Sequence, residues 1–375
     1  MHTIIINALN NNSAGGKSIF LNLLRQLKND ESYTFVILTS QNIDELRFEN
    51  DRVNYKKMSS WYSKGVLAPI VYRYLIGKII FKLNADLVIN LGDLLIETTV
   101  KQVYWFDWAY ATYPESLAWS RMSWFDYLNR KLKLYLIKKH IKKVHTVIAQ
   151  TESNRKRLQV NYGISNIIVI PNAVSVDHYK SESAPHKKHA GTINLMYLTR
   201  YYSHKNLEVI LKVADTLIAR NIFNISITLT VDKNQSRDAY NFIKQCAVNG
   251  RWKVIKNIGA IPMSEVPTAF ANCHGLLMPT LLESFSGTYV EAMYHEKPIF
   301  TSDLDFARDV CANGAYYFDP LSELDIVDTI LSAFEDLDDI QEKIDLNRMR
   351  LKQFKTWDNV GRDVNDLIRN ILNKY

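Results

Sequence analysis

The chain has 375 residues, of which 47% are hydrophobic and 23% are charged. This balance is ordinary for a soluble globular protein, it excludes a disordered or fibrous chain, and the length is comfortable for two domains. The net charge of +7 is unevenly placed: residues 1–175 hold 23 Lys and Arg against 13 Asp and Glu, whereas residues 176–375 hold 23 against 26. The basic first half predicts either an anionic partner or a well solvated surface.

Short apolar, β-branched runs alternate with helical patterns along the first half, which predicts a parallel sheet with both faces covered. The expected strands are residues 3–9, 33–39, 87–91, 102–106, 146–150 and 167–170, and the expected helices are residues 18–28 and 152–161. The start of the chain is expected to be a strand rather than a secretory signal, because its apolar run is short and has no basic segment before it. Three basic residues interrupt the apolar stretch 66–83, so it predicts a buried or surface helix rather than a membrane span.

A polar stretch at 181–191 is the best linker candidate, after which the strand–helix rhythm restarts. The expected strands are residues 193–198, 225–231, 254–258, 275–278, 298–301 and 315–318, and the expected helices are 206–221, 239–249, 264–272 and a long tail at 323–372. We therefore predict an α/β fold of two doubly wound, Rossmann-like domains facing one another across a cleft. Their expected bounds are 1–180 and 190–350, with residues 351–375 forming a helix that crosses back to the first domain.

Two carboxylates, Glu283 and Glu291, bracket a small polar turn between an expected strand and an expected helix. In an open parallel sheet such a strand end is where ligands bind, and the free N–H groups at a helix start favour a phosphate. Carboxylates on either side would bind hydroxyl groups. The pattern predicts a site for a nucleotide-sugar, with its ribose, diphosphate and hexose. The turn residues are Ser284, Phe285, Ser286, Gly287 and Thr288.

Arg200 and Lys205 lie on the strand–loop–helix junction that opens the second half. Two cations five residues apart can both reach one diphosphate and can stabilise the charge that develops on it as it departs. The alternative is a pair of exposed surface cations. Together with the carboxylates, the diphosphate interpretation is favoured.

The first strand is followed by Gly15, Gly16, Lys17 and Ser18, which resemble a phosphate-binding P-loop. Asn11 stands where that pattern requires its first glycine, and no partner for Mg²⁺ is evident. The alternatives are a glycine turn that lets the backbone approach a substrate, on an acceptor or donor loop, and a plain tight turn.

The aromatic run at 104–110 contains Asp107, and rings beside a carboxylate suit a sugar; core aromatics with a capping Asp are the alternative. Farther along, Leu134, Ile137 and Ile141 recur at helical spacing among lysines in the run 130–143. Such a helix either lies on anionic lipid or packs on the core with a solvated basic face. The three cysteines form no Cys-x-x-Cys pair and the histidines have no metal-ligand spacing, so we expect no metal and a reducing, cytoplasmic location.

The segment 279–298 resembles the donor site of the family 4 retaining glycosyltransferases, which have the GT-B fold. Glu283-Ser284-Phe285 and Glu291-Ala292-Met293 match the family's Glu-x7-Glu motif. Arg200 and Lys205 match its diphosphate-binding pair, and residues 148–151 and 169–172 match the end of its first domain. The resemblance covers nearly all of the second domain and scattered pieces of the first. It departs from the pattern where Glu296-Lys297 replaces a glycine.

The resemblance implies a role for each of these residues. Glu283 would contact donor-sugar hydroxyls and stabilise an oxocarbenium-like transition state, the N–H groups of residues 286–288 would hold phosphate oxygens, and Glu291 would bind the ribose. Asp107 stands where the family often carries a His near the reacting sugar, so we count it with Glu283, Arg200 and Lys205 among the expected catalytic residues. The implied reaction moves a sugar, with retention, from a nucleotide-diphosphate donor to a glycan or lipid-linked acceptor.

The same resemblance implies a place in bacterial cell-surface polysaccharide or lipopolysaccharide synthesis, with no cofactor, metal or nucleic acid. The basic first half adds the expectation of a peripheral location on the inner face of the membrane. Two rival hypotheses remain at this point. They are a P-loop NTPase that uses Gly16-Lys17-Ser18, and a non-catalytic sugar-nucleotide-binding protein.

Overall fold

The structure, a computed structural model, describes residues 1–11, 14–40, 51–59, 62, 68–92, 94–173 and 191–373. The chain divides into two compact units, which are described separately. The first unit comprises residues 1–113, 123–173 and 355–375, and the second comprises residues 114–122 and 174–354. The expected linker at 181–191 lies outside the described residues except for Gly191.

The first unit is built on a seven-stranded sheet in the order β3-β2-β1-β4-β5-β6-β7, in which all paired strands are parallel. The sequence did not predict β3, because only one of its five residues is buried and its pattern is that of an exposed edge. The other strands lie within one or two residues of their expected bounds. The strands are β1 (His2–Asn7), β2 (Tyr33–Thr39), β3 (Val53–Lys57), β4 (Leu87–Asn90), β5 (Lys101–Trp105), β6 (Thr146–Ala149) and β7 (Ile167–Val169).

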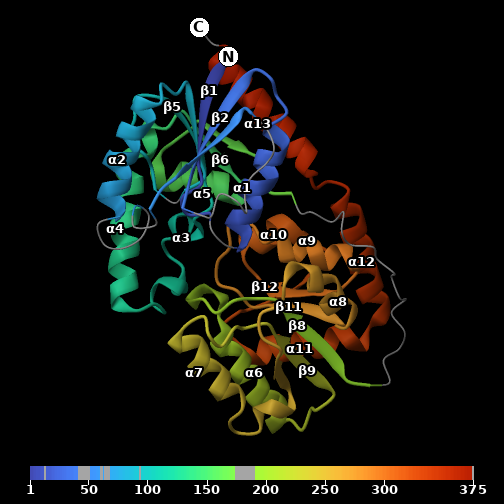
Figure 1. Ribbon diagram of the computed structural model, residues 1–375. Coiled ribbons are helices and arrows are strands. Elements are labelled where there is room, and N and C mark those ends of the chain that lie inside the picture. The colour runs from blue at the N-terminus through green and yellow to red at the C-terminus, as the bar shows by residue number, and fades with distance from the viewer. Residues whose placement is uncertain are drawn as a thin grey trace. The chain divides into compact units, whose positions relative to one another are not determined.

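Successive side chains of β1 point to opposite faces of this sheet, and each face has its own hydrophobic core. Ile4 and Ile6 pack with α1 (Ala14–Leu27) and α13 (Trp357–Leu372). Ile5 packs on the other face with α2 (Ala68–Lys82), which formed where the sequence predicted a buried or surface helix. Figure 1 shows α13 beside α1. The remaining helices of this unit are α3 (Ala109–Thr112), α4 (Trp124–His140) with the 3-10 turn η4 (Ile141–Lys143), and α5 (Glu152–Tyr162).

The second unit has a six-stranded sheet in the order β10-β9-β8-β11-β12-β13, again with parallel pairs throughout. Helices of this unit precede and follow the strands in the alternation that the sequence predicted (Figure 1). The strands are β8 (Ile193–Tyr197), β9 (Ile225–Leu229), β10 (Ile255–Asn257), β11 (Gly275–Met278), β12 (Ile299–Ser302) and β13 (Tyr316–Phe318). The α-helices are α6 (Leu207–Ala219), α7 (Arg237–Cys246), α8 (Val266–Ala271), α9 (Gly287–Tyr294), α10 (Asp305–Cys311), α11 (Glu323–Glu335) and α12 (Leu337–Leu351).

The expected helical tail at 323–372 is present and consists of three helices, α11, α12 and α13. Two capping side chains mark the new starts. The Asp336 carboxylate accepts hydrogen bonds from the N–H groups of residues 338 and 339, and the Thr356 hydroxyl accepts one from that of residue 359. Such caps satisfy the first free N–H groups of a helix and so fix where it begins. Among the described residues, no helix has both the length and the apolar character needed to cross a bilayer.

The contact between α1 and α13 depends on a glycine. A Cβ atom added at Gly361 on α13 would lie 2.5 Å from Cβ of Gln26 on α1, which is closer than real side chains approach. The ion pair Arg369–Asp30, with Nη2 and Oδ2 2.8 Å apart, joins α13 to the turn that follows α1. Close packing at residue 361 therefore holds the last helix of the chain on the first unit.

We expect Gly361→Ala to lower the free energy of unfolding by about 1–3 kcal/mol through overpacking, despite the better helix propensity of Ala. Differential scanning calorimetry of the full chain measures the change. The matched control is Gly15→Ala in the first turn of α1, where an added Cβ meets nothing within 4 Å. Equal stability of the two variants would contradict the packing argument.

Candidate functional site

The second unit has a topological switch point between β8 and β11. These two strands are neighbours, but the chain leaves β8 toward β9 on one side and leaves β11 toward β12 on the other. The loops that follow the two strands therefore diverge at the carboxyl edge of the sheet and leave a crevice, which is where open α/β sheets bind ligands. The first loop carries Arg200 and Lys205, and the second carries Glu283.

Hydrogen bonds join these two loops directly. The carbonyl oxygen of His204 accepts a hydrogen bond from the N–H group of Leu281, at 2.7 Å, and lies 3.0 Å from the Thr280 hydroxyl oxygen. From the end of β12, the Ser302 hydroxyl donates a hydrogen bond to the carbonyl oxygen of Thr280 at 2.7 Å. The loop after β8 is thus fixed against the loop after β11.

Lys205 and Glu283 meet across this join. Lys205 Nζ lies 2.5 Å from Glu283 Oε1, and their side chains are only 16% and 11% exposed. The Thr280 hydroxyl oxygen lies 3.1 Å from the same carboxylate oxygen. The structure therefore brings together two of the residues predicted from sequence, as a largely buried ion pair at the mouth of the crevice.

Two buried tyrosines lie beneath the site: Tyr197 contacts the loop after β8, and Tyr289 joins α9 to β12. The Tyr197 hydroxyl donates to the carbonyl oxygen of Lys205 at 2.6 Å, and the Tyr289 hydroxyl lies 2.7 Å from that of Thr301. Burial raises the pKa of both tyrosines well above the ordinary value, and the Glu283 carboxylate raises that of Tyr197 further. Both hydroxyls therefore stay neutral at physiological pH, and Tyr197 keeps the proton that it donates to the backbone of Lys205.

Arg200 has a fixed backbone and an exposed side chain. The N–H group of Thr199, just before it, donates to the Thr230 hydroxyl at 2.8 Å, and that of Tyr201, just after it, donates to Gln235 Oε1 at 3.0 Å. No ion pair is formed by its guanidinium with the residues that the structure describes. A guanidinium that is carried on a fixed backbone and forms no such ion pair is well suited to bind an incoming anion.

Helix α9 begins where the sequence predicted the phosphate-binding turn. Ser286 is its N-cap residue, and no side chain caps the helix; Gly287 and Thr288 form its first turn. The first turn contains no acidic residue, so the positive end of the helix dipole is not compensated there. Glu291 lies in the second turn and is 7% exposed.

Asn206 is a site residue that the sequence analysis missed. It is fully buried, has a left-handed backbone with φ of 55°, and its Nδ2 donates to the carbonyl oxygens of Pro279 at 2.9 Å and Pro320 at 2.7 Å. Its Oδ1 accepts a hydrogen bond from Arg121, which lies in the segment 114–122. One side chain thus ties four segments together beside Lys205. The sequence does not indicate this role for Asn206, because its partners include backbone carbonyl groups that lie far from it along the chain.

Asp107 lies at the carboxyl end of β5 in the first unit. It is exposed and accepts a hydrogen bond from Gln150 Nε2 at 2.8 Å, and it is not the N-cap of α3, which is Trp108. The neighbouring rings of Tyr104, Trp105 and Phe106 are at most 2% exposed. The aromatic run is therefore mainly core, and the rings before Asp107 are not available to a sugar.

The predicted loop through Gly15, Gly16 and Lys17 is wrong, because α1 begins at Ala14 and these residues form its first turns. The reason lies in Asn11, whose Nδ2 donates to the carbonyl oxygen of Gly16 at 3.2 Å and would lie 3.0 Å from a Cβ there. Glycine at 16 thus allows a close approach within a helix rather than a turn. The helix still starts at the switch point of this unit, since β1 and β4 are neighbours whose chains diverge.

Comparisons with known proteins extend this description. Residues 179–348 match the family model described as Glycosyl transferases group 1. Comparison with curated protein sequences gave no match. Among solved structures, the chain is similar to sucrose-phosphate synthase from Thermosynechococcus elongatus (TM-score 0.79, 12% identity, 100% of both chains). It is also similar to Anabaena HepE in complex with UDP-glucose (TM-score 0.72, 12% identity, 99% of this chain and 100% of that chain). A third similar structure is WaaG, a glycosyltransferase involved in lipopolysaccharide biosynthesis (TM-score 0.72, 12% identity, 98% of this chain and 99% of that chain).

At these identities the solved structures show the fold. The predicted α/β class with two doubly wound parallel sheets is confirmed, and the fold is GT-B. The family match falls on the half of the chain that carries the crevice between β8 and β11. The match and the fold together support glycosyl transfer.

We expect Asn206→Asp to lower the free energy of unfolding by about 2–5 kcal/mol, because the variant cannot donate to two buried carbonyl groups. Urea denaturation of the full chain measures the change. Asn221→Asp is the matched control, since Asn221 has nearly the same φ, 57°, and is exposed. A loss of the same size in the control would show that backbone strain, and not the side-chain contacts, is responsible.

Proposed function

We propose that the protein is a retaining glycosyltransferase of family 4 that uses a nucleotide-diphosphate sugar as its donor. The observation that carries the proposal is the Lys205–Glu283 ion pair. It stands at the switch point between β8 and β11, where the uncapped start of α9 follows the same loop. A cation, a carboxylate and free amide groups at one crevice match the parts of a diphosphate sugar.

In the proposed reaction the acceptor hydroxyl attacks the anomeric carbon of the donor sugar from the side on which the diphosphate leaves, as the bond from that carbon to the phosphate oxygen breaks. The nucleoside diphosphate leaves with the bonding electrons, and the hydroxyl proton passes to a phosphate oxygen. Arg200 and Lys205 stabilise the negative charge that develops on the leaving group, as do the N–H groups of Ser286, Gly287 and Thr288. Glu283 binds sugar hydroxyls and stabilises positive charge at the anomeric carbon.

The other donor contacts are those that the family resemblance implies. Glu291, in the second turn of α9, binds the ribose hydroxyls. Ser284 and Phe285 form the loop between the catalytic carboxylate and the helix start. The structure of HepE in complex with UDP-glucose supports a nucleotide-sugar donor for a chain of this fold.

The first unit is proposed to bind the acceptor. Asp107, at the carboxyl end of β5, and the start of α1 at Gly15, Gly16 and Lys17 lie on strand ends of that unit, where ligands bind in such sheets. The acceptor class is a glycan or a lipid-linked glycan of bacterial cell-surface polysaccharide synthesis, and the involvement of WaaG in lipopolysaccharide biosynthesis supports this. The location that fits such an acceptor is cytoplasmic, at the inner face of the membrane.

We expect Glu283→Gln to lower the rate of sugar transfer by roughly 10²–10³-fold, because it removes the charge that stabilises the transition state. The assay measures nucleoside diphosphate released from a panel of UDP-, GDP- and dTDP-sugars. Glu296→Gln is the matched control, a partly exposed carboxylate that pairs with Arg348 on the surface. Undiminished turnover in Glu283→Gln would contradict the assignment, and a wild type that binds donors without turnover would favour a non-catalytic sugar-nucleotide-binding protein.

We expect activity to survive EDTA, because Arg200, Lys205 and the amides of α9 neutralise the leaving diphosphate in the proposed reaction. The measurement compares initial rates with and without excess chelator. The same test separates the rival P-loop NTPase, which would need Mg²⁺ for its phosphate chemistry. Loss of turnover on chelation, restored by Mg²⁺, would overturn metal independence.

A further inference from the structure

A row of polar side chains follows three neighbouring strands of the first unit. Strands β5, β6 and β7 are parallel neighbours, and Asp107, Gln150 and Asn172 lie just beyond their carboxyl ends. Backbone hydrogen bonds of 2.9 Å continue the pairing by one residue past β5 and past β7, at Phe106 and Ile170. The three side chains are therefore brought together at one edge of the sheet, although they are far apart in the sequence.

Hydrogen bonds join these three side chains in series. Gln150 Nε2 donates to Asp107 Oδ1 at 2.8 Å, and Asn172 Nδ2 donates to Gln150 Oε1 at 3.0 Å. Gln150 is 1% exposed and Asn172 is 9% exposed, whereas Asp107 is exposed. The series, which we call the 107–150–172 relay, thus runs from two buried amides to one carboxylate at the surface of the unit.

The Gln150 amide has a donor end and an acceptor end, so its orientation matters. Because Asn172 donates to Oε1, the NH₂ group of Gln150 is directed at Asp107. A turned amide would place its oxygen against the carboxylate and its NH₂ group against that of Asn172, so both contacts would be repulsive. Asn172 therefore acts on Asp107 through Gln150.

A role in stability alone does not account for this arrangement. Buried amides can join strand ends, but that role does not need an exposed carboxylate as the last member. Asn172 Oδ1 is also buried and accepts no hydrogen bond from the residues that the structure describes, which costs stability. The relay is better suited to hold a carboxylate in a defined orientation where a ligand can reach it.

The carboxylate selects the chemistry of that ligand. A hydrogen bond donated to one carboxylate oxygen favours the charged form, and a carboxylate can accept several further hydrogen bonds. Uncharged hydroxyl groups are suitable donors, whereas phosphate and carboxylate groups would be repelled. Asp107 is thus suited to the hydroxyl groups of a sugar and not to an anionic group.

We propose that Gln150 and Asn172 are positioning residues of the acceptor site, which hold Asp107 charged and in one orientation so that it binds uncharged hydroxyl groups of a glycan acceptor. The inference rests on the proposed glycosyl transfer and names the part of the acceptor that lies at Asp107. Asp107 only accepts hydrogen bonds, and the hydroxyl proton still passes to a phosphate oxygen of the donor. Any charged group of the acceptor has to lie elsewhere.

The first experiment tests the hydrogen bonds without any substrate. Gln150→Glu places a second carboxylate against Asp107, and we expect it to lower the melting temperature of the full chain at neutral pH by roughly 5 °C. When Asp107→Asn is added, the new amide can donate to the new carboxylate. About half of the loss or more is then expected to be recovered.

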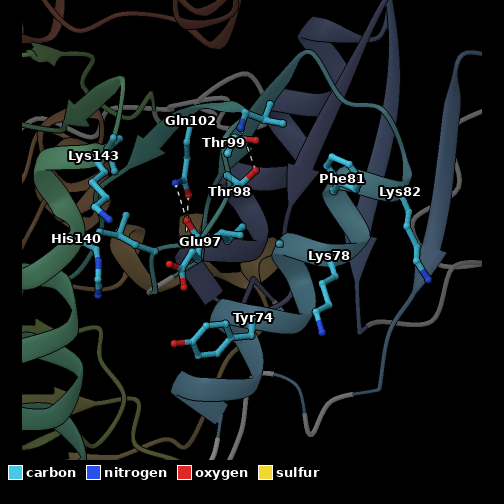
Figure 2. A pocket seen from close by; sticks show the side chains of 15 residues that line it. Tyr74, Lys78, Phe81, Lys82, Glu97, Thr98, Thr99, Gln102, His140 and Lys143 are labelled. Atoms are coloured by element: carbon cyan, nitrogen blue, oxygen red, sulfur yellow. Dashed lines mark hydrogen bonds between the residues drawn. The ribbon is translucent and has the colours of Figure 1, made fainter.

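Gln102 on β5 supplies the matched control, because it is 6% exposed and forms hydrogen bonds through both ends of its amide. Figure 2 shows it beside the cavity of about 540 Å³ that it lines, with its hydrogen bonds to the backbone of Ile96 as dashed lines. Gln102→Glu also buries a carboxylate, but Asp107→Asn is not expected to restore its stability. Failure to restore Gln150→Glu, or equal restoration of Gln102→Glu, would overturn the proposal.

The second experiment measures sugar transfer to methyl α-glucoside, methyl α-galactoside and methyl α-mannoside. Gln150→Met keeps the approximate size of the side chain and adds no charge, so it tests the relay even if Gln150→Glu does not fold. We expect it to lower kcat/KM for the acceptor roughly tenfold. KM for the nucleotide-sugar donor should stay within about twofold, because the proposed donor residues belong to the second unit.

Asn172→Leu removes the group that orients Gln150. We expect a smaller loss of kcat/KM for the acceptor than in Gln150→Met, and no further loss when the two substitutions are combined, because Asn172 acts through Gln150. Additive losses would show that Asn172 acts independently and would overturn the relay. Equal kcat/KM in Gln150→Met and the wild type would overturn it as well.

Glucose 6-phosphate, galactose 6-phosphate and mannose 6-phosphate are the charged probes for the same assay. We expect the wild type to prefer the uncharged sugars, and Asp107→Asn to reduce that preference. A wild type that prefers the phosphates, or that transfers to none of the uncharged sugars, would overturn the assignment of Asp107 to acceptor hydroxyl groups.

Calorimetric titration with UDP separates this inference from the proposed function. Retained UDP binding in a protein whose relay variants behave like the wild type would reject the relay and leave the proposed donor site standing. A wild type that binds no UDP would contradict the proposed function, and this inference with it.

Discussion

The second unit depends on one main-chain oxygen, the carbonyl of His204, which meets both the N–H group of Leu281 and the hydroxyl of Thr280. Parallel sheets separate the loops at a switch point, so without such a join the loops after β8 and β11 would move independently. Because the join lies one residue before Lys205, it carries that lysine to Glu283. The crevice is consequently assembled before any ligand arrives, which reduces the ordering cost of binding.

The Lys205–Glu283 ion pair is suited to exchange its partners when a diphosphate binds. Its members are 16% and 11% exposed, so each needs a partner, and the partner in the structure is the other. A diphosphate that enters the crevice competes for the lysine with more negative charge than one carboxylate has. In the proposed reaction this competition turns Glu283 toward the sugar hydroxyls, while Tyr197 and Thr280 hold the backbone carbonyl groups of Lys205 and His204 in place. The ion pair with Lys205 thus holds the Glu283 carboxylate at the crevice, where its proposed role requires it.

The sequence predicted most of the fold because hydrophobic period and strand length are local signals, and β2 and β11 match their expected bounds. It missed β3, whose exposed edge has no apolar pattern, and it misplaced the start of α1 because the contact between Asn11 and Gly16 is not visible in a glycine-rich run. At the site, the spacing of the charged residues along the sequence indicated their role. Asn206 had none, since its partners, Pro279, Pro320 and Arg121, are distant in sequence and adjacent only after folding.

The first unit also has hydrogen bonds between side chains at its switch point. In the first unit the carboxyl ends of the strands carry polar groups such as Asn7 and Asn90, which hydrogen bond to one another at 2.7 Å at the switch point. Acceptor binding at these strand ends, as proposed, would therefore start from side chains that are already held in place by hydrogen bonds.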